Sequence, residues 1–240
     1  MTVKFFQRFS LFILIFCGAA TFVNAQRLVG VVKTADGKPI EKAWIRPGYV
    51  TETDKDGKFV IEKFTDKFLI VTMKSFRPLI KKLNGETEIE VVLERESENG
   101  RLMIPECAKK SDGKIVGENL KISVPKGFKG KKGNDVDYSA FSLFPKNEQK
   151  YVLFGISGAN ASSGYPRDEW INSTGKLNIR TITNGKREIG FDYFGQTNDG
   201  KYWRYVQIID EYISYLVDTS ERKEIFDKII ESACVNPDLL

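Results

Sequence analysis

One serine in the chain lies in a setting similar to that of a catalytic nucleophile. Ser157 stands between glycines in the run Gly155-Ile-Ser-Gly-Ala159, directly after an apolar stretch. A serine hydroxyl needs a neighbouring base to attack a carbonyl carbon, and the usual base is histidine, which this chain lacks. A lysine base remains conceivable. A loop of small residues after a strand explains the same run without chemistry, and we favour that interpretation.

Other constellations that could do chemistry are also incomplete. The absence of histidine excludes histidine-based triads, typical catalytic zinc sites and haem held by histidine. The run Asp54-Lys-Asp-Gly57 resembles the start of a calcium loop, but Thr65 stands where that loop needs glutamate. Paired carboxylates such as Asp135 and Asp137 could be imagined as a glycosidase pair, but no pattern places two carboxylates across a cleft as that reaction requires. We expect no catalytic residue, no metal and no cofactor; the alternative is a histidine-independent secreted hydrolase using Ser157 or a carboxylate pair.

A dense group of aromatic residues lies on two adjacent predicted strands. Its members are Tyr193, Tyr202, Trp203 and Tyr205. Because side chains alternate between the faces of a sheet, some should point inward as core and others outward. The outward ones could stack on sugars or on a protein partner, so the group is a candidate binding surface. Trp44, on an earlier strand, could also stack on a carbohydrate, but core or inter-sheet packing is the favoured interpretation.

The second part of the candidate binding surface is basic. Lys129, Lys131 and Lys132 lie in the segment 125–134, whose proline, glycines and lysines predict a mobile loop. Lysines on such a loop could contact anionic glycans or lipid headgroups. A solvated loop tip without a partner is the alternative.

Residues 1–25 have the three parts of a secretory signal peptide. A basic start precedes an apolar run over 9–20, and small residues precede a predicted cleavage between Ala25 and Gln26. The apolar run is too short to span a bilayer comfortably, and no later segment is long enough. We expect a secreted or periplasmic protein with no transmembrane segment after processing; an uncleaved anchor is the alternative.

Processing changes the net charge only slightly. Loss of Lys4 and Arg8 lowers the number of basic residues from 37 to 35, against 32 acidic ones, so the formal charge falls from +5 to +3. A charge this small on an exported protein does not indicate nucleic acid as a partner.

Two cysteines remain once Cys17 leaves with the signal peptide. Cys107 and Cys234 lie near the two ends of the second predicted domain. An oxidising compartment favours disulfides, so a Cys107–Cys234 bond is predicted. Two buried free thiols are the alternative.

Residues 27–96 predict an antiparallel β-sandwich. Short apolar strands recur along this segment, with turn residues between them and no helical period. Several runs resemble the carboxypeptidase regulatory-like family, and they are Gly30-Val-Val, Asp36-Gly-Lys-Pro-Ile40, Ala43, Thr53-Asp-Lys-Asp-Gly-Lys-Phe59 and Glu90-Val-Val-Leu93. The resemblance covers nearly all of the domain. It implies a transthyretin-like sandwich that acts as a structural or docking unit of exported proteins and carries no catalytic residues.

Residues 100–240 predict an α+β domain that follows a charged boundary segment. Strands in which apolar and polar residues alternate are separated by tight turns such as Asn184-Gly185. Helices are expected over 166–173 and after Asp218 or Thr219, where an amphipathic segment ends the chain. The predicted fold class is therefore mainly β plus α+β: a sandwich followed by an antiparallel sheet with a packed C-terminal helix.

Four short runs in this second domain are faintly similar to PsbP-like domains. They are Val124-Pro-Lys-Gly-Phe128, Val136-Asp-Tyr-Ser-Ala-Phe141, Gly200-Lys-Tyr-Trp-Arg204 and Phe226-Asp-Lys-Ile-Ile-Glu-Ser232. The similarity implies an α/β/α sandwich used for docking or ligand binding, usually without catalysis. The sequence as a whole favours a non-enzymatic binding protein of the cell envelope whose partner is an envelope protein or a glycan. A hydrolase and a structural subunit of an envelope complex are the rival hypotheses.

Overall fold

The computed structural model describes most of the chain after the predicted signal peptide. The described residues are 26–46, 51–108, 114–115, 120–134, 138–147, 153–158, 166, 168–185, 187–209 and 211–237. Residues 1–25 lie outside this set, so the signal peptide and its cleavage stay predictions. Among the described residues, no helix has the length and apolar character needed to cross a bilayer.

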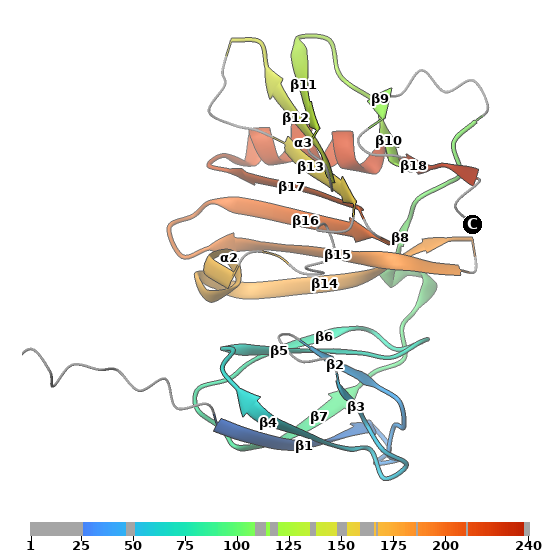
Figure 1. Ribbon diagram of the computed structural model, residues 1–240, viewed down its shortest axis with the longest axis vertical. Helices are drawn as coiled ribbons and strands as arrows, with labels where there is room; N and C mark the ends of the chain where they lie inside the picture. Colours follow the sequence, from blue (N-terminus) through green and yellow to red (C-terminus); the bar gives the residue numbers. More distant parts are fainter. Residues whose placement is uncertain are drawn as a thin grey trace, which may run out of the picture.

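Seven strands form a sandwich of two sheets at the N-terminal end (Figure 1). The first sheet has the order β4–β1–β7, with β1 (Gln26–Thr34), β4 (Lys58–Phe64) and β7 (Glu88–Leu93). The second has the order β3–β2–β5–β6, with β2 (Trp44–Arg46), β3 (Thr51–Glu52), β5 (Phe68–Thr72) and β6 (Leu79–Lys82). β1 runs parallel to β7, and the other pairs are antiparallel.

Alternation along the strands builds the core of the sandwich. In β4, Phe59 and Ile61 are buried while Val60 and Glu62 face outward, and β7 alternates in the same way. β5 differs because all five of its residues are buried. A strand with two buried faces must lie between two layers of structure, and the second layer is supplied by the rest of the chain.

The larger sheet follows the short helix η1 (Glu98–Gly100), with the strand order β11–β12–β13–β17–β16–β15–β14–β8. Its strands are β8 (Leu102–Met103), β11 (Phe128–Asn134), β12 (Tyr138–Pro145), β13 (Leu153–Gly158), β14 (Thr174–Asn184), β15 (Arg187–Thr197), β16 (Tyr202–Ile208) and β17 (Glu211–Val217). The helix α2 (Asp168–Asn172) precedes β14. The mainly β and α+β fold class is confirmed.

The helix α3 (Ser220–Glu231) packs behind the large sheet as seen in Figure 1. The side chain of Thr219 caps it by accepting a hydrogen bond from the N–H of Arg222 at 3.3 Å. Phe226, Ile229 and Ile230 are buried on one side of α3 and pack into the apolar core on that face of the sheet. The predicted amphipathic C-terminal helix is therefore present.

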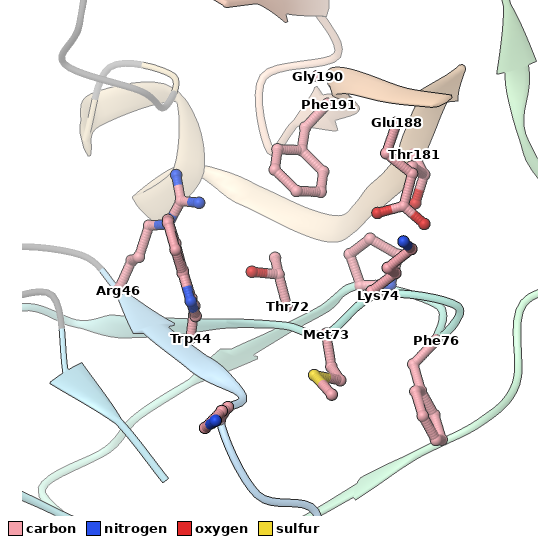
Figure 2. A pocket seen from close by; sticks show the side chains of 12 residues that line it. Trp44, Arg46, Thr72, Met73, Lys74, Phe76, Thr181, Glu188, Gly190 and Phe191 are labelled. Carbon is pink, nitrogen blue, oxygen red and sulfur yellow. The ribbon is translucent and has the colours of Figure 1, made fainter. Parts of the chain in front are cut away.

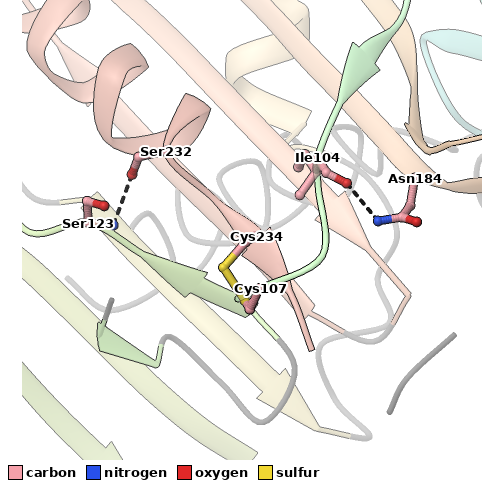
Figure 3. Close-up of a disulfide and its surroundings, with 6 residues drawn as sticks. All are labelled: Ile104, Cys107, Ser123, Asn184, Ser232 and Cys234. Atoms are coloured by element: carbon pink, nitrogen blue, oxygen red, sulfur yellow. Dashed lines mark hydrogen bonds between the residues drawn. A yellow bond between two sulfur atoms is a disulfide. The ribbon is translucent and has the colours of Figure 1, made fainter. Parts of the chain in front are cut away.

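The predicted disulfide between Cys107 and Cys234 is confirmed (Figure 3). Cys234 lies three residues after the end of α3, in β18 (Cys234–Val235), which pairs with β10 (Leu120–Ile122). A third short strand, β9 (Lys114–Ile115), completes this small sheet. The bond therefore joins the segment that follows the last helix to the segment that follows β8.

The segment 125–134 is a strand over most of its length, so the prediction of a mobile loop is wrong. β11 is an edge strand that pairs with β12 from Phe128 to Asn134. Phe128 anchors it, because its ring packs edge-on against the ring of Phe226 in α3, with centroids 6.0 Å apart. Glycine and lysine are unfavourable in strands, so the composition of this segment did not indicate the strand β11.

Candidate functional site

The sandwich and the larger sheet meet in an apolar junction that buries most of the predicted aromatic surface. Tyr193, Trp203 and Tyr205 have exposed fractions of 0%, 1% and 4%. They share one core with Phe68 and Ile70 of β5, which explains why both faces of β5 are buried. The three rings therefore form no exposed surface, because the sandwich covers this face of the sheet around β14–β16.

The remaining candidate residues do not join these rings. Tyr202 is half-buried on the opposite face of β16, against the core beneath α3. Lys129, Lys131 and Lys132 are exposed on the edge strand β11, at the far end of the sheet from the junction. Lysines on an edge strand discourage pairing with a second chain, which gives them a structural role without a ligand. The predicted residues therefore form no single surface.

Ser157 is part of β13 and does not lie in a loop after it. Its backbone pairs with Ser139 on one side and Glu211 on the other. Its side chain lies outside the described part of the structure, as do Asp135 and Asp137. Within the described ranges, no group of three or more histidine, cysteine, aspartate or glutamate residues is placed to hold a metal ion.

A buried group of charges lies on the α3 face of the large sheet. Asp192 is fully buried and accepts hydrogen bonds from the guanidinium groups of Arg204 and Arg180. Arg204 also donates to Asp227 of α3, which receives a second bond from the hydroxyl of Tyr215. These charges are paired within the protein, so we assign the group a structural role in holding α3 to the sheet.

This network alters the acidity of its members. Burial opposes ionisation of Asp227, but hydrogen bonds from Lys223 and Tyr215 and the charge of Arg204 outweigh it and lower the pKa of that carboxyl. The pKa of the Tyr215 hydroxyl is raised, first by burial and then by the negative charge of Asp227. Both groups are therefore held in the forms that complete the network at neutral pH.

A groove of about 420 Å³ opens beside the apolar junction, between the sandwich and β14 and β15 (Figure 2). Side chains from both parts of the chain line it, and they are Lys42, Trp44, Arg46, Thr72, Met73, Lys74, Phe76, Pro78, Thr181, Glu188 and Phe191, together with Gly190. A second hollow of about 320 Å³ lies between β6, β7 and β14 and has mainly aliphatic walls. The first groove has the more varied chemistry and is the candidate site.

Arg46 links the two walls of this groove. Its guanidinium carbon lies 5.3 Å from the ring centroid of Trp44 in the sandwich and 5.7 Å from that of Phe191 in the large sheet. These distances are those of cation–π contacts. Nε of Arg46 is buried and has no hydrogen-bond partner among the described residues. A buried guanidinium nitrogen without an acceptor is costly, so the described residues leave the hydrogen-bonding capacity of Arg46 incompletely used.

Trp44 is 47% exposed, so core packing is the wrong half of the favoured interpretation; the residue lies between the sandwich and the large sheet, where it lines the groove. Trp44 and Arg46 are two residues apart on β2 and therefore lie on the same face of that strand, while Ile45 between them enters the sandwich core. In Figure 2 the Trp44 ring stands beside the Arg46 side chain, on the side of the groove interior, and the guanidinium reaches past the ring toward the large sheet. One face of the indole is thus available to a ligand.

A β-bulge aims Glu188 into the groove. The pairing of β14 with β15 shifts from Ile182–Gly190 to Thr183–Glu188, so Ile189 is extra. Ile189 consequently joins the core beneath α3, and Glu188 turns toward the sandwich, where its carboxylate accepts a hydrogen bond of 3.3 Å from the N–H of Ser75.

Gly190 permits this geometry, because a Cβ there would collide with the backbone carbonyl oxygen of Gln207. Lys42 and Ser75, on the sandwich side, have φ values of +59° and +68°, which are unfavourable for residues other than glycine. Strained backbone of this kind is concentrated at functional sites.

One feature of the sequence indicated this groove but was not used to predict the binding surface. Trp44 and Arg46 alternate with a buried isoleucine, and such spacing places an aromatic ring and a cation side by side on one face. Glu188 and Phe191 gave no signal, because the bulge that turns Glu188 toward the groove is invisible in the sequence. Comparison with models of known protein families finds no match to this chain, and comparison with curated proteins finds none either.

Proposed function

We propose that the chain is an exported, non-enzymatic binding protein of the cell envelope and that the groove between the sandwich and β14–β15 is its binding site. The observation that carries this proposal is the Arg46 guanidinium, which lies between Trp44 and Phe191 with its buried Nε unpaired among the described residues. Export rests on the signal-like segment 1–25, which is a sequence-based prediction.

The two parts of the chain contribute jointly to the proposed site. Glu96, between the sandwich and the large sheet, has a side chain that is only 2% exposed. It accepts hydrogen bonds from Nε of Arg101 at 3.1 Å and from the N–H of Thr181 at 3.3 Å. This buried carboxylate fixes the connecting segment against β14, so both walls of the groove keep their relative positions. A site of this kind requires the whole chain, and neither half alone would present it.

The family resemblances agree with a binding role and stay predictions. A carboxypeptidase regulatory-like sandwich would supply a docking unit, and a PsbP-like domain would supply a ligand-binding sheet. In this chain the sandwich itself covers part of the sheet face opposite α3, through Phe68 and Ile70. The groove is formed beside that contact.

The test compares binding of the mature chain, residues 26–240, with that of groove variants. The protein is immobilised and exposed to fractionated envelope from the source organism and to a glycan array. Binding that is lost in both Trp44→Ala and Arg46→Ala, and kept in the control Val60→Ala, supports the proposal. Val60 is 40% exposed on β4, in the sheet remote from the groove.

Three results would count against the proposal. Binding that is indifferent to both groove substitutions would remove the groove as the site. Turnover of peptide, ester or glycoside substrates that disappears in Ser157→Ala would favour a hydrolase. Isolation in a fixed ratio with other envelope proteins, unaffected by either substitution, would favour a structural subunit.

A further inference from the structure

We infer that the groove binds an acidic saccharide, with a carboxylate of the ligand on Arg46 and a sugar ring on the free face of Trp44. This inference rests on the proposed function and specifies the class of its ligand.

The charge of the groove selects an anion. Lys42, Arg46 and Lys74 face a single carboxylate, Glu188, among the residues that line it. Glu188 is already engaged by the N–H of Ser75 and lies 4.0 Å from Nη2 of Arg101. The planar guanidinium of Arg46 matches a carboxylate through two parallel N–H donors, which a lysine cannot provide.

The same charges exclude a cationic ligand. Aromatic rings such as those of Trp44 and Phe191 are typical of sites that bind organic ammonium groups. Here the guanidinium of Arg46 already lies against both rings. An incoming cation would meet it and two lysines within a groove of about 420 Å³.

The walls of the groove favour a saccharide over a peptide. Extended peptides bind mainly by adding a strand to an exposed sheet edge, where main-chain groups are unpaired. β2 is paired on both sides, with β3 and β5, and β15 is paired with β14 and β16. The strands of the groove thus offer no unpaired edge to a peptide, and a ligand is recognised mainly by side chains of these strands and of the loops that hold Lys42 and residues 73–78. Stacking on an indole and hydrogen bonds from hydroxyl groups meet that condition.

Hydroxyl partners are present around the Trp44 platform. Thr72 and Thr181 line the groove from β5 and β14, and the carboxylate of Glu188 can accept from a sugar hydroxyl. The volume lies near the lower end of the range for small-molecule sites, which suits one or two sugar rings.

Calorimetry on the mature chain tests this assignment with defined probes. The probes are trigalacturonic acid, a hyaluronan tetrasaccharide and sialyllactose, with the methyl ester of each saccharide and the peptide triglutamate as controls. We expect at least one acidic saccharide to bind, the neutral ester of that ligand to bind more weakly, and affinity to fall as salt is raised. Arg46→Ala should weaken binding roughly tenfold to hundredfold, as for loss of a hydrogen bond to a charged group.

Further variants separate charge from shape. Arg46→Lys keeps the charge but loses the parallel donors, so it should also bind more weakly than the wild type. Trp44→Ala should lose the stacking contribution, and Val60→Ala should bind normally. Unchanged melting temperatures in the variants show that the fold is intact.

The outcomes distinguish this inference from the proposed function. Binding of triglutamate with no binding of any acidic saccharide would overturn the ligand class and leave the groove as the site. Absence of binding to all probes, while envelope material still binds through Trp44 and Arg46, would likewise overturn the ligand class and leave the groove as the site. Equal affinity for the acid and its ester would overturn the pairing of a carboxylate with Arg46. Envelope binding that ignores both substitutions would instead remove the proposed function itself.

Discussion

Arg204 and Asp192 form a two-point ion pair across neighbouring strands of the large sheet. Nε of Arg204 lies 3.0 Å from Oδ1 of Asp192, and Nη2 lies 3.1 Å from Oδ2. The third guanidinium nitrogen, Nη1, donates to Asp227 of α3 at 2.8 Å. One buried arginine thus connects two strands and the helix, and its charge is balanced on both sides.

Removing the charge of Asp192 should destabilise the fold. Asp192→Asn leaves Arg204 and Arg180 without their shared carboxylate in a buried site, which we expect to cost about 3–5 kcal/mol of the free energy of unfolding. Urea denaturation measures this loss. Glu224→Gln is the matched control on the exposed face of α3, where Glu224 pairs with Lys228, and it should leave stability nearly unchanged. Similar stabilities for Asp192→Asn and the control would contradict the assigned role of the network.

Tyr215 should make the protein sensitive to alkali. Its folded pKa is raised above the ordinary value of 10.0, so the folded state retains a proton that the unfolded state releases. Stability is therefore complete below pH 10 and falls as the pH rises above it, by up to about 1.4 kcal/mol per pH unit. Urea midpoints between about pH 8 and pH 11 should fall more steeply for the wild type than for Tyr215→Phe. Parallel curves would show that Tyr215 does not titrate on unfolding.

The disulfide should stabilise the chain chiefly by restricting its unfolded state. Cys107 and Cys234 are 127 residues apart in sequence, and closing a loop of that size is worth up to about 5 kcal/mol on the chain-entropy model. We expect the double variant Cys107→Ser, Cys234→Ser to unfold at a lower urea concentration than the oxidised wild type. Reduced wild type should match the variant. If reduction leaves the midpoint unchanged, the bond has no such effect.

The junction between the sandwich and the large sheet should couple the unfolding of the two parts. Phe68 is 1% exposed and packs in the same core as Trp170 and Trp203. Phe68→Ala should cost about 3–5 kcal/mol and separate a single unfolding transition into two, because it leaves a cavity between the layers. Val60→Ala, on the outer sheet, should change the midpoint little. A single unshifted transition in Phe68→Ala would mean that the junction contributes little.

Processing of the N-terminus can be checked by mass spectrometry of the exported protein. The expected mature chain begins at Gln26. Ala25→Arg should block cleavage, because the position before the cut needs a small residue, whereas Ala25→Ser should be processed normally. Efficient cleavage of Ala25→Arg at the same bond would contradict the predicted signal peptide.

The sequence by itself determined the local features whose causes lie within a few residues. The short strands of the sandwich, such as β4 and β7, the capped helix α3 and the turn at Asn184-Gly185 depend on side-chain pattern and backbone preference, and each was predicted correctly. The pairing of Cys107 with Cys234 was also determined, because removal of the predicted signal peptide leaves only these two cysteines.

Only the tertiary structure decided which face of each strand meets another layer. The aromatic residues at 193, 203 and 205 were candidates for a binding surface although core packing was favoured for most of the group, and contact with β5 buried them. Trp44 looked like a core residue, yet β2 turns it away from the sandwich core and into the groove. The bulge at Ile189 then directs Glu188 to the same place. Alternation specifies two faces for a strand, but the packing of distant segments decides what each face contacts, and such long-range contacts leave no local pattern in the sequence.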